Sequence, residues 1–182
     1  MTAIVGIADG QQVWLGGDSA GVSGFNRTIR ADSKVFVSGA MVFGFTSSFR
    51  MGQLLRYKLE APRYHPDDDA MTYLCGDWID AVRATLKGGG FASVTAGVEQ
   101  GGKFLIGFKG KLYCVESDFQ IGESVDQFHA VGCGDSYALG SLHATKTTKA
   151  SPVDRIERAL EAAAYFSAGV APPFVTVVGA NK

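Results

Sequence analysis

Three residues with chemically useful side chains lie at equal steps of sixteen near the start of the chain: Thr2, Asp18 and Lys34. Thr2 follows Met1, and because methionine excision tolerates a small second residue, we expect the mature chain to begin with threonine. An N-terminal threonine has a free α-amine beside its hydroxyl, so it supplies the base that activates its own nucleophile. The alternative is a structural threonine beside an ordinary Asp–Lys ion pair on adjacent strands.

The segments around these residues resemble those of proteasome β subunits and the bacterial HslV peptidase. The family pattern is Thr-x15-Asp-x15-Lys, and Thr2–Ile7 is similar to the opening strand of these subunits. Gly44–Ser48 falls at the small-residue turn before the family's first helix, and Gly132–Ala138 resembles its Gly-Ser-Gly-x-x-Tyr/Phe-Ala motif. The resemblance covers nearly the whole chain. It implies one domain over residues 1–182 with an α+β fold, the four-layer αββα sandwich of N-terminal nucleophile (Ntn) hydrolases.

The resemblance also implies a role for each residue of the predicted site. Thr2 would be the nucleophile, with its mature α-amine as the base. Lys34 would lower the cost of forming an alkoxide, and Asp18 would hold Lys34 in position and keep it charged. The backbone N–H of Ser48, at the family's glycine position, would stabilise the oxyanion.

Three further positions depart from the family pattern. Cys133 stands where the family has a serine in its Gly-Ser-Gly turn, and a thiol is a weak hydrogen-bond donor. Ser167 and Val170 align with an aspartate and a serine that follow the family's last helix, and Val170 can offer only its backbone carbonyl. We assign Cys133 and Ser167 supporting roles. A catalytic Cys133 thiol is the alternative to a small residue in a tight turn.

Hydrophobic patterning predicts the strands that must position these residues. The first two are apolar enough to be buried on both faces, and the turn Asp9-Gly10 joins them as a hairpin. Gly21–Thr28 is expected to be a loop. The predicted strands are Ala3–Ala8, Val13–Gly17, Lys34–Val37, Met41–Phe45, Ser93–Val98, Lys103–Phe108, Lys111–Val115, Phe128–Val131 and Phe174–Val178.

Helical periodicity appears between these two groups of strands and again near the end. Ser47-Ser48 is expected to be the N-cap of a first helix, and a second helix is expected from Pro66 to the Gly88–Gly90 run. The second helix has an apolar stripe of Met71, Leu74, Trp78 and Val82. Later helices are expected over Asp135–His143 and from Ser151, where a cap, Pro152 at N1 and Asp154 at N3 mark a helix start.

Composition narrows the class of protein. The chain has 182 residues and a net charge of −1, with no charge excess that would indicate nucleic-acid or membrane binding. Its odd number of cysteines favours a reduced, cytoplasmic protein, and no signal peptide or membrane span is expected. No phosphate loop is present. His65, His129 and His143 are too scattered for a triad or metal site, so no metal or cofactor is expected.

The sequence therefore predicts a threonine endopeptidase subunit that hydrolyses peptides or unfolded proteins. The family resemblance implies a homo-oligomeric ring, and an ATP-dependent unfoldase would be a separate chain. We also expect part of the apolar helix surface around Trp78 to contact neighbouring subunits. Two alternatives remain: a ring or scaffold protein of this fold with little activity, and a small-molecule amidase of the Ntn fold.

Overall fold

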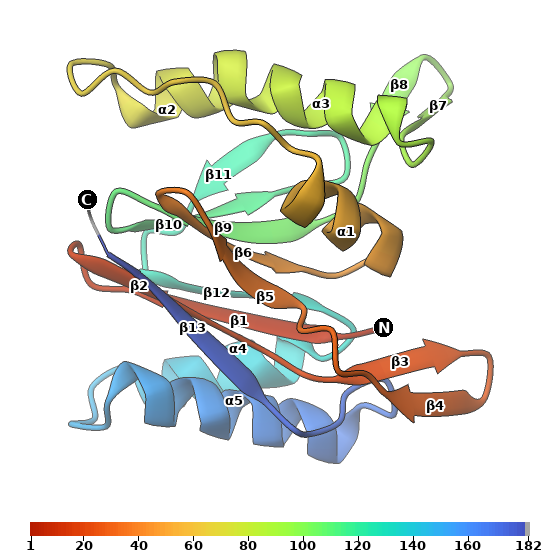
Figure 1. Ribbon diagram of the computed structural model, residues 1–182. Coiled ribbons are helices and arrows are strands. Elements are labelled where there is room, and N and C mark those ends of the chain that lie inside the picture. Colours follow the sequence, from red (N-terminus) through yellow and green to blue (C-terminus); the bar gives the residue numbers. More distant parts are fainter. Residues whose placement is uncertain (181–182) are drawn as a thin grey trace.

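Two antiparallel sheets pack face to face, and helices cover the outer face of each sheet (Figure 1). The computed structural model describes residues 1–180. The first sheet has the order β12 (Phe128–Gly132), β1 (Ala3–Ala8), β2 (Gln12–Gly17), β13 (Val175–Ala180). The second has the order β11 (Ile121–Glu123), β10 (Lys111–Val115), β9 (Phe104–Phe108), β6 (Met41–Phe45), β5 (Val35–Ser38). The arrangement confirms the predicted αββα sandwich.

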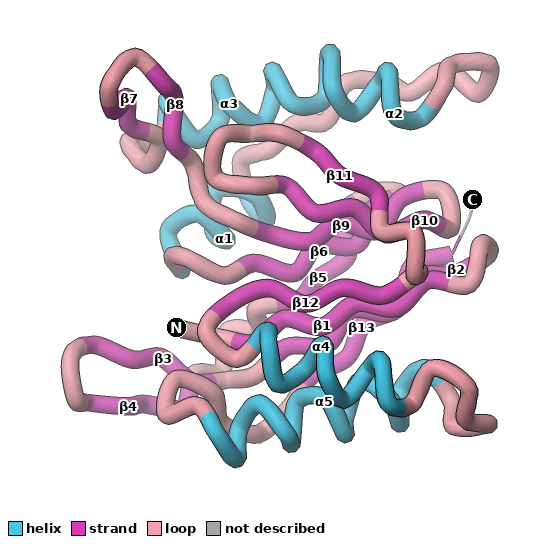
Figure 2. The backbone as a smooth tube through the Cα atoms, turned by 180° about the vertical axis from the view of Figure 1, so that it is seen from behind, coloured by secondary structure: helices cyan, strands magenta, loops and turns pink. Residues whose placement is uncertain are grey.

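The two helical layers come from different parts of the chain, as Figure 2 shows from behind. One layer contains α1 (Phe49–Tyr57), α2 (Ala70–Tyr73), the π-helical turn η1 (Leu74–Trp78) and α3 (Ile79–Gly88). The other contains α4 (Asp135–Ala144) and α5 (Pro152–Phe166). Two small hairpins project from the sandwich: β3 (Ala20–Ser23) with β4 (Asn26–Ile29), and β7 (Ser93–Thr95) with β8 (Val98–Gln100). Within residues 1–180, no helix is long and apolar enough to cross a membrane.

Three apolar clusters separate the four layers. One lies between the five-stranded sheet and α1–α3, one between the four-stranded sheet and α4–α5, and one between the two sheets. Strand β1 contributes to both clusters that flank its sheet, and all six of its residues are buried. This double burial confirms the prediction from its unbroken apolar sequence.

Local capping signals are confirmed at two helix starts. The Ser48 side chain accepts a hydrogen bond from the backbone N–H of Arg50 at 3.0 Å and caps α1. Ser151 and Asp154 form a reciprocal capping box at the start of α5, with Pro152 at the first helical position. Each cap satisfies backbone donors that a helix cannot pair internally.

Several element predictions are wrong in detail. Gly21–Thr28 is not a loop, because the β3–β4 hairpin occupies it, and Gly24 makes the tight turn at φ +56°. Ser93–Val98 is likewise a hairpin rather than one strand. The second helix begins at Ala70 with Asp69 as its N-cap, and it is interrupted at Gly76, whose φ of −105° and ψ of −109° are not helical. The short edge strand β11 was not predicted.

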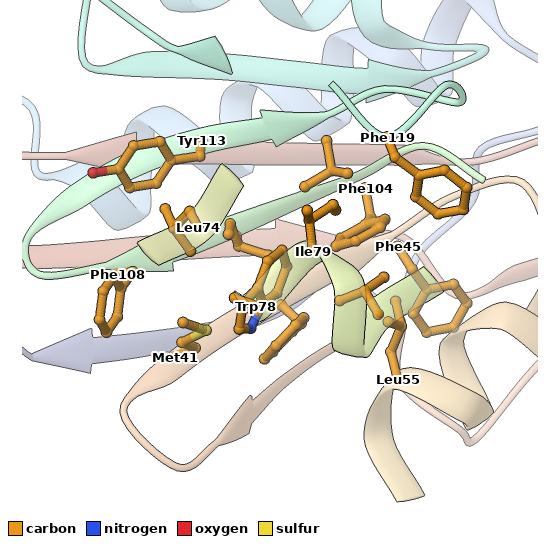
Figure 3. Close-up of a cluster of buried hydrophobic side chains, with 14 of the residues drawn as sticks. Met41, Phe45, Leu55, Leu74, Trp78, Ile79, Phe104, Phe108, Tyr113 and Phe119 are labelled. Carbon is orange, nitrogen blue, oxygen red and sulfur yellow. The ribbon is translucent and has the colours of Figure 1, made fainter. Parts of the chain in front are cut away.

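The expectation that the helix surface around Trp78 contacts other subunits is wrong. Leu74, Trp78 and Val82 are each 0% exposed within this chain, and Met71 packs against the same cluster. Figure 3 shows Trp78 surrounded by aromatic and aliphatic side chains, which come from the five-stranded sheet and the helices that cover it. The three fully buried side chains therefore hold the helices on their own sheet and are not available to a neighbour, while Met71 is only partly buried.

Phe43 provides a stability test of this core. Its ring stacks on Phe36 at 5.1 Å and lies 6.3 Å from the Trp78 ring, with 2% of the residue exposed. We expect Phe43→Ala to lower the free energy of unfolding by about 3–5 kcal/mol, because it removes buried apolar surface and leaves a cavity. The matched change Phe25→Ala, at the exposed tip of the β3–β4 hairpin, should cost less than about 0.5 kcal/mol. Denaturant unfolding measures both, and equal losses would contradict this packing.

Candidate active site

Asp18 and Lys34 form an ion pair that is removed from solvent. The Lys34 ammonium donates to Asp18 Oδ1 at 2.8 Å, and the two side chains are 1% and 0% exposed for Lys34 and Asp18 respectively. A charge buried at this depth is tolerated only when it is paired and hydrogen-bonded. Two residues that are sixteen positions apart in the sequence are thus in direct contact in the structure.

The Asp18 carboxylate also organises the backbone around it. Asp18 follows the last residue of β2, and its Oδ1 accepts the N–H of Ala3 at 3.0 Å. Its Oδ2 accepts the N–H of Ala20 at 2.9 Å and that of Ala171 at 3.3 Å. One carboxylate thus connects the start of β1, the start of β3 and the segment between α5 and β13.

Lys34 is held by backbone contacts on both sides of it. The Phe45 N–H donates to the Lys34 carbonyl at 3.0 Å, which continues the pairing of β5 with β6. The Arg56 guanidinium, from α1, donates to the carbonyls of Ser33 at 2.7 Å and Val35 at 3.2 Å. Burial lowers the pKa of Lys34 below its ordinary value, while the charge of Asp18 acts in the opposite direction.

Thr2 lies beside this pair, at the entrance to β1, and is 3% exposed. Its backbone N–H donates to Cys133 Sγ at 3.2 Å, and its carbonyl accepts the N–H of Gly134 at 3.3 Å. Gly132 has a φ of +110°, and a Cβ there would lie 2.2 Å from the Thr2 carbonyl oxygen. The glycine-rich turn is therefore required for the close approach of this backbone to Thr2.

The predicted supporting residues lie on the side of the Thr2 nitrogen. Cys133 Sγ and Ser167 Oγ are 3.2 Å apart, and Ser167 is the C-cap residue of α5. Val170 is buried, and its N–H donates to the Ser167 carbonyl at 3.1 Å. A Cβ on Gly169 would lie 2.7 Å from Cys133 Sγ, so this turn also depends on a glycine. The structure brings Thr2, Cys133 and Ser167 into one connected group.

Ser48 lies at the same cavity, but its N–H has a partner inside the turn. The Ser48 N–H donates to the Thr46 carbonyl at 2.7 Å. Ser47, between them, has a φ of +62°, which is uncommon for a residue with a side chain. The Ser47 hydroxyl accepts the Lys103 N–H at 3.0 Å, so the turn is tied to the start of β9.

A cavity of about 270 Å³ opens beside Thr2, Lys34 and Ser48. The N-terminus and the β3–β4 hairpin lie at this end of the sandwich (Figures 1 and 2). Residues that the sequence reasoning did not assign to the site also line it: Met1, Gly21, Val22, Ser23, Asn26, Thr28, Arg30, Phe45, Thr46, Ser47 and Phe49. The sequence contained a signal for the β3–β4 hairpin that was not used, the two-residue loop Gly24-Phe25. In contrast, no local sequence feature indicated that the Ala171 N–H contacts Asp18.

Comparison with known proteins identifies the fold. No family model and no curated protein sequence matches the chain. Among solved structures, BPH of Thiobacillus denitrificans, a bacterial proteasome homologue determined in complex with epoxomicin, has a TM-score of 0.81 and 18% identity, covering 99% of each chain. Eukaryotic HslV of Trypanosoma brucei has a TM-score of 0.68 and 14% identity, covering 97% of this chain and 98% of its own. An Anbu mutant of Hyphomicrobium has a TM-score of 0.68 and 14% identity, covering 99% and 82%.

These neighbours are proteasome-like Ntn peptidases, and the chain has their fold. The expected resemblance is therefore confirmed at the level of architecture. In chemical terms, the buried Lys34 ammonium and Thr2 line one cavity, and the Asp18 carboxylate pairs with that ammonium from outside the lining. Such a cation can lower the energy of an anion that develops on a neighbouring hydroxyl.

The buried pair predicts how the stability of an Asp18→Asn variant depends on pH. The Lys34 ammonium then loses the carboxylate that opposes its desolvation, so its pKa falls further. Between the folded-state pKa and the higher unfolded-state pKa, the unfolded chain binds more protons, and the free energy of unfolding rises with pH. We expect the variant's stability deficit to shrink as the pH is raised from about 6 to about 10.

Urea unfolding of both proteins at each pH measures this deficit. The control is the double variant Asp18→Asn, Lys34→Met, which has no ammonium to titrate and should lose this dependence. A deficit that stays constant, or grows, toward high pH would show that Lys34 is not a buried, desolvated cation.

Proposed function

We propose that the chain is a threonine endopeptidase of the proteasome type, with Thr2 as its N-terminal nucleophile. The observation that carries the proposal is that Thr2 and Lys34 line the same cavity. The buried Asp18 carboxylate holds the Lys34 ammonium there through their ion pair. An isolated structural ion pair would have no need to lie beside a threonine at an open cleft. The neighbouring BPH structure, determined with epoxomicin, supports this choice within the fold.

In the proposed reaction, the Thr2 hydroxyl attacks the carbonyl carbon of a substrate peptide bond. Its proton passes to the free α-amine, and Lys34 stabilises the developing negative charge on oxygen. The tetrahedral intermediate collapses to an ester on Thr2, and the protonated amine gives its proton to the departing substrate nitrogen. Water then attacks the ester, releases the acid product and restores the Thr2 hydroxyl.

The amine acts as a base only when Met1 has been removed. In the structure the Thr2 nitrogen belongs to the peptide bond with Met1, and Met1 lines the cavity. After removal, the new amine would stay beside Cys133 Sγ, which is 3.2 Å from that nitrogen, and Ser167 would lie one hydrogen bond further away. We assign these two residues the role of positioning the amine.

Ser48 is the proposed oxyanion donor, through its backbone N–H. Because this N–H now donates to the Thr46 carbonyl, the turn must open for it to reach a substrate oxygen. The Ser48 side chain can stay in place during this change, since it caps α1 through a separate hydrogen bond. The opening therefore has to move the Thr46–Ser47 peptide group, which carries the acceptor carbonyl.

The assembly and setting of the enzyme are also part of the proposal. We infer one Ntn-hydrolase domain over residues 1–182 that forms homo-oligomeric rings, acts on peptides or unfolded proteins, and receives them from a separate ATP-dependent unfoldase. An exposed aromatic cluster on α4–α5 supports subunit contacts: Tyr137 and Phe166 stack at 5.1 Å, and Tyr165 lies 4.8 Å from Phe166. The cysteines Cys75, Cys114 and Cys133 are free, which supports a reducing, cytoplasmic compartment.

The first test identifies the nucleophile without requiring the natural substrate. The purified protein is incubated with epoxomicin, denatured and weighed by intact mass spectrometry. We expect an N-terminus at Thr2 and a mass gain of one epoxomicin, because the activated hydroxyl can open the epoxide. Thr2→Ala should gain nothing, and an upstream extension that blocks the amine should also prevent labelling. Labelling that persists in Thr2→Ala would exclude Thr2 as the nucleophile.

The second test separates Lys34 from Cys133 by the rate of peptide hydrolysis. Lys34→Ala should lower kcat/KM by at least about a hundredfold, because it removes the charge that stabilises the alkoxide. Cys133→Ser keeps a small polar group beside the Thr2 nitrogen and should retain most of the activity. If Cys133→Ser were inactive while Thr2→Ala still turned over, the thiol would be the nucleophile. Inactivity of correctly matured wild-type protein would favour the scaffold alternative.

A further inference from the structure

Arg30 forms one wall of the cleft beside Thr2. It follows the end of β4, and its side chain is 38% exposed. Its guanidinium carbon lies 3.9 Å from the centre of the Phe49 ring, which is the first residue of α1. Arg30 and Phe49 both line the cavity, so a flat cation stacked on an aromatic face borders the space next to the nucleophile.

Two further contacts fix this orientation. Arg30 Nε and Nη2 donate to Asp32 Oδ1 and Oδ2, each at 2.7 Å, in the bidentate geometry that arginine favours. A Cβ on Gly21 would lie 2.8 Å from Arg30 Cδ, so the absence of a side chain there lets Arg30 lie along β3. The guanidinium is therefore held by a ring, a carboxylate and the hairpin backbone before any ligand arrives.

The charged side chains that line the cleft are both cations. Arg30 and Lys34 line the cavity, and none of the described residues that line it carries a carboxylate. Asp32 holds the guanidinium from outside the lining, and Asp18 is buried against Lys34. A negatively charged side chain in the cleft can pair with these cations, whereas a positively charged one finds no carboxylate among the described residues that line the cavity.

We propose that this cleft selects peptide substrates with a glutamate or aspartate close to the cleaved bond, and that Arg30 is the residue that determines this specificity. The inference rests on the proposed peptidase function and adds the substrate class. Asp32 limits how strongly Arg30 can bind an acidic substrate side chain, because Asp32 already accepts two of the guanidinium hydrogen bonds. Removal of the Asp32 carboxylate should therefore strengthen the preference for an acidic residue, while removal of Arg30 should abolish that preference.

The test uses fluorogenic peptides in matched pairs that differ only by Glu or Gln. One pair is made for each of the three residues that precede the cleaved bond, since the glutamine peptide has the same shape without the charge. The wild-type enzyme should show a kcat/KM ratio of at least about tenfold in favour of Glu for one of these positions. Arg30→Gln should reduce that ratio to within about twofold of unity, and Asp32→Asn should increase it.

Two further variants test whether the selectivity depends on a charge placed at the cleft, and a labelling control detects misfolding. Arg27→Gln removes the same charge from an exposed position of β4 that does not line the cavity, and it should leave the ratio unchanged. Arg30→Glu should reverse the selectivity toward a lysine peptide. Epoxomicin labelling of each variant shows whether its nucleophile remains intact, so misfolding is detected separately.

The outcomes for this inference and for the proposed function are distinct. Cleavage of these peptides with no Glu preference above threefold at any position would overturn the role of Arg30 and leave the peptidase in place. A preference that survives in Arg30→Gln would assign the selectivity to another group. If the matured wild-type protein neither cleaves any peptide nor reacts with epoxomicin, the proposed function itself fails.

Discussion

Burial of the Asp18 carboxylate is the constraint on which the site depends. The carboxylate accepts hydrogen bonds from the Lys34 ammonium and from the backbone N–H groups of Ala3, Ala20 and Ala171. These donors come from segments far apart in sequence, and the pair connects the end of the four-stranded sheet to β5 of the other sheet. Leaving any buried donor or charge without its partner is costly. The two sheets are therefore held in one relative position where the cleft opens.

Much of the fold could be predicted because its signals are local. The unbroken apolar sequence of β1 indicated burial on both faces, and the capping box at Ser151 marked the start of α5. The strand predictions failed where a segment forms a strand only because it pairs with a neighbouring segment. All residues of β4 are exposed, so its sequence has no apolar alternation that would predict a strand. Its formation depends instead on the tight turn at Gly24. The break at Gly76 likewise lies inside an ordinary helical pattern.

The residues of the candidate site likewise fall into two groups, those that the sequence could predict and those that only the tertiary structure brings together. Thr2, Asp18 and Lys34 were selected because their spacing and the segments around them match the family pattern, and each lies on or beside a strand whose register is fixed by burial. The remaining members are assembled by tertiary contacts. Nothing near Ala171 in sequence indicates that its N–H reaches Asp18, and the partner of the Ser48 N–H depends on a left-handed backbone at Ser47.

The backbone at Thr2 is fixed independently of its side chain. On one side, the Ala3 N–H donates to Asp18, and on the other the Thr2 carbonyl accepts the Gly134 N–H. Gly132 leaves room for this approach, since a Cβ there would collide with the Thr2 carbonyl. None of these contacts uses the threonine hydroxyl. A change confined to that side chain therefore leaves the strand, the ion pair and the cleft in place, so the chemistry of the hydroxyl can be separated from the architecture that presents it.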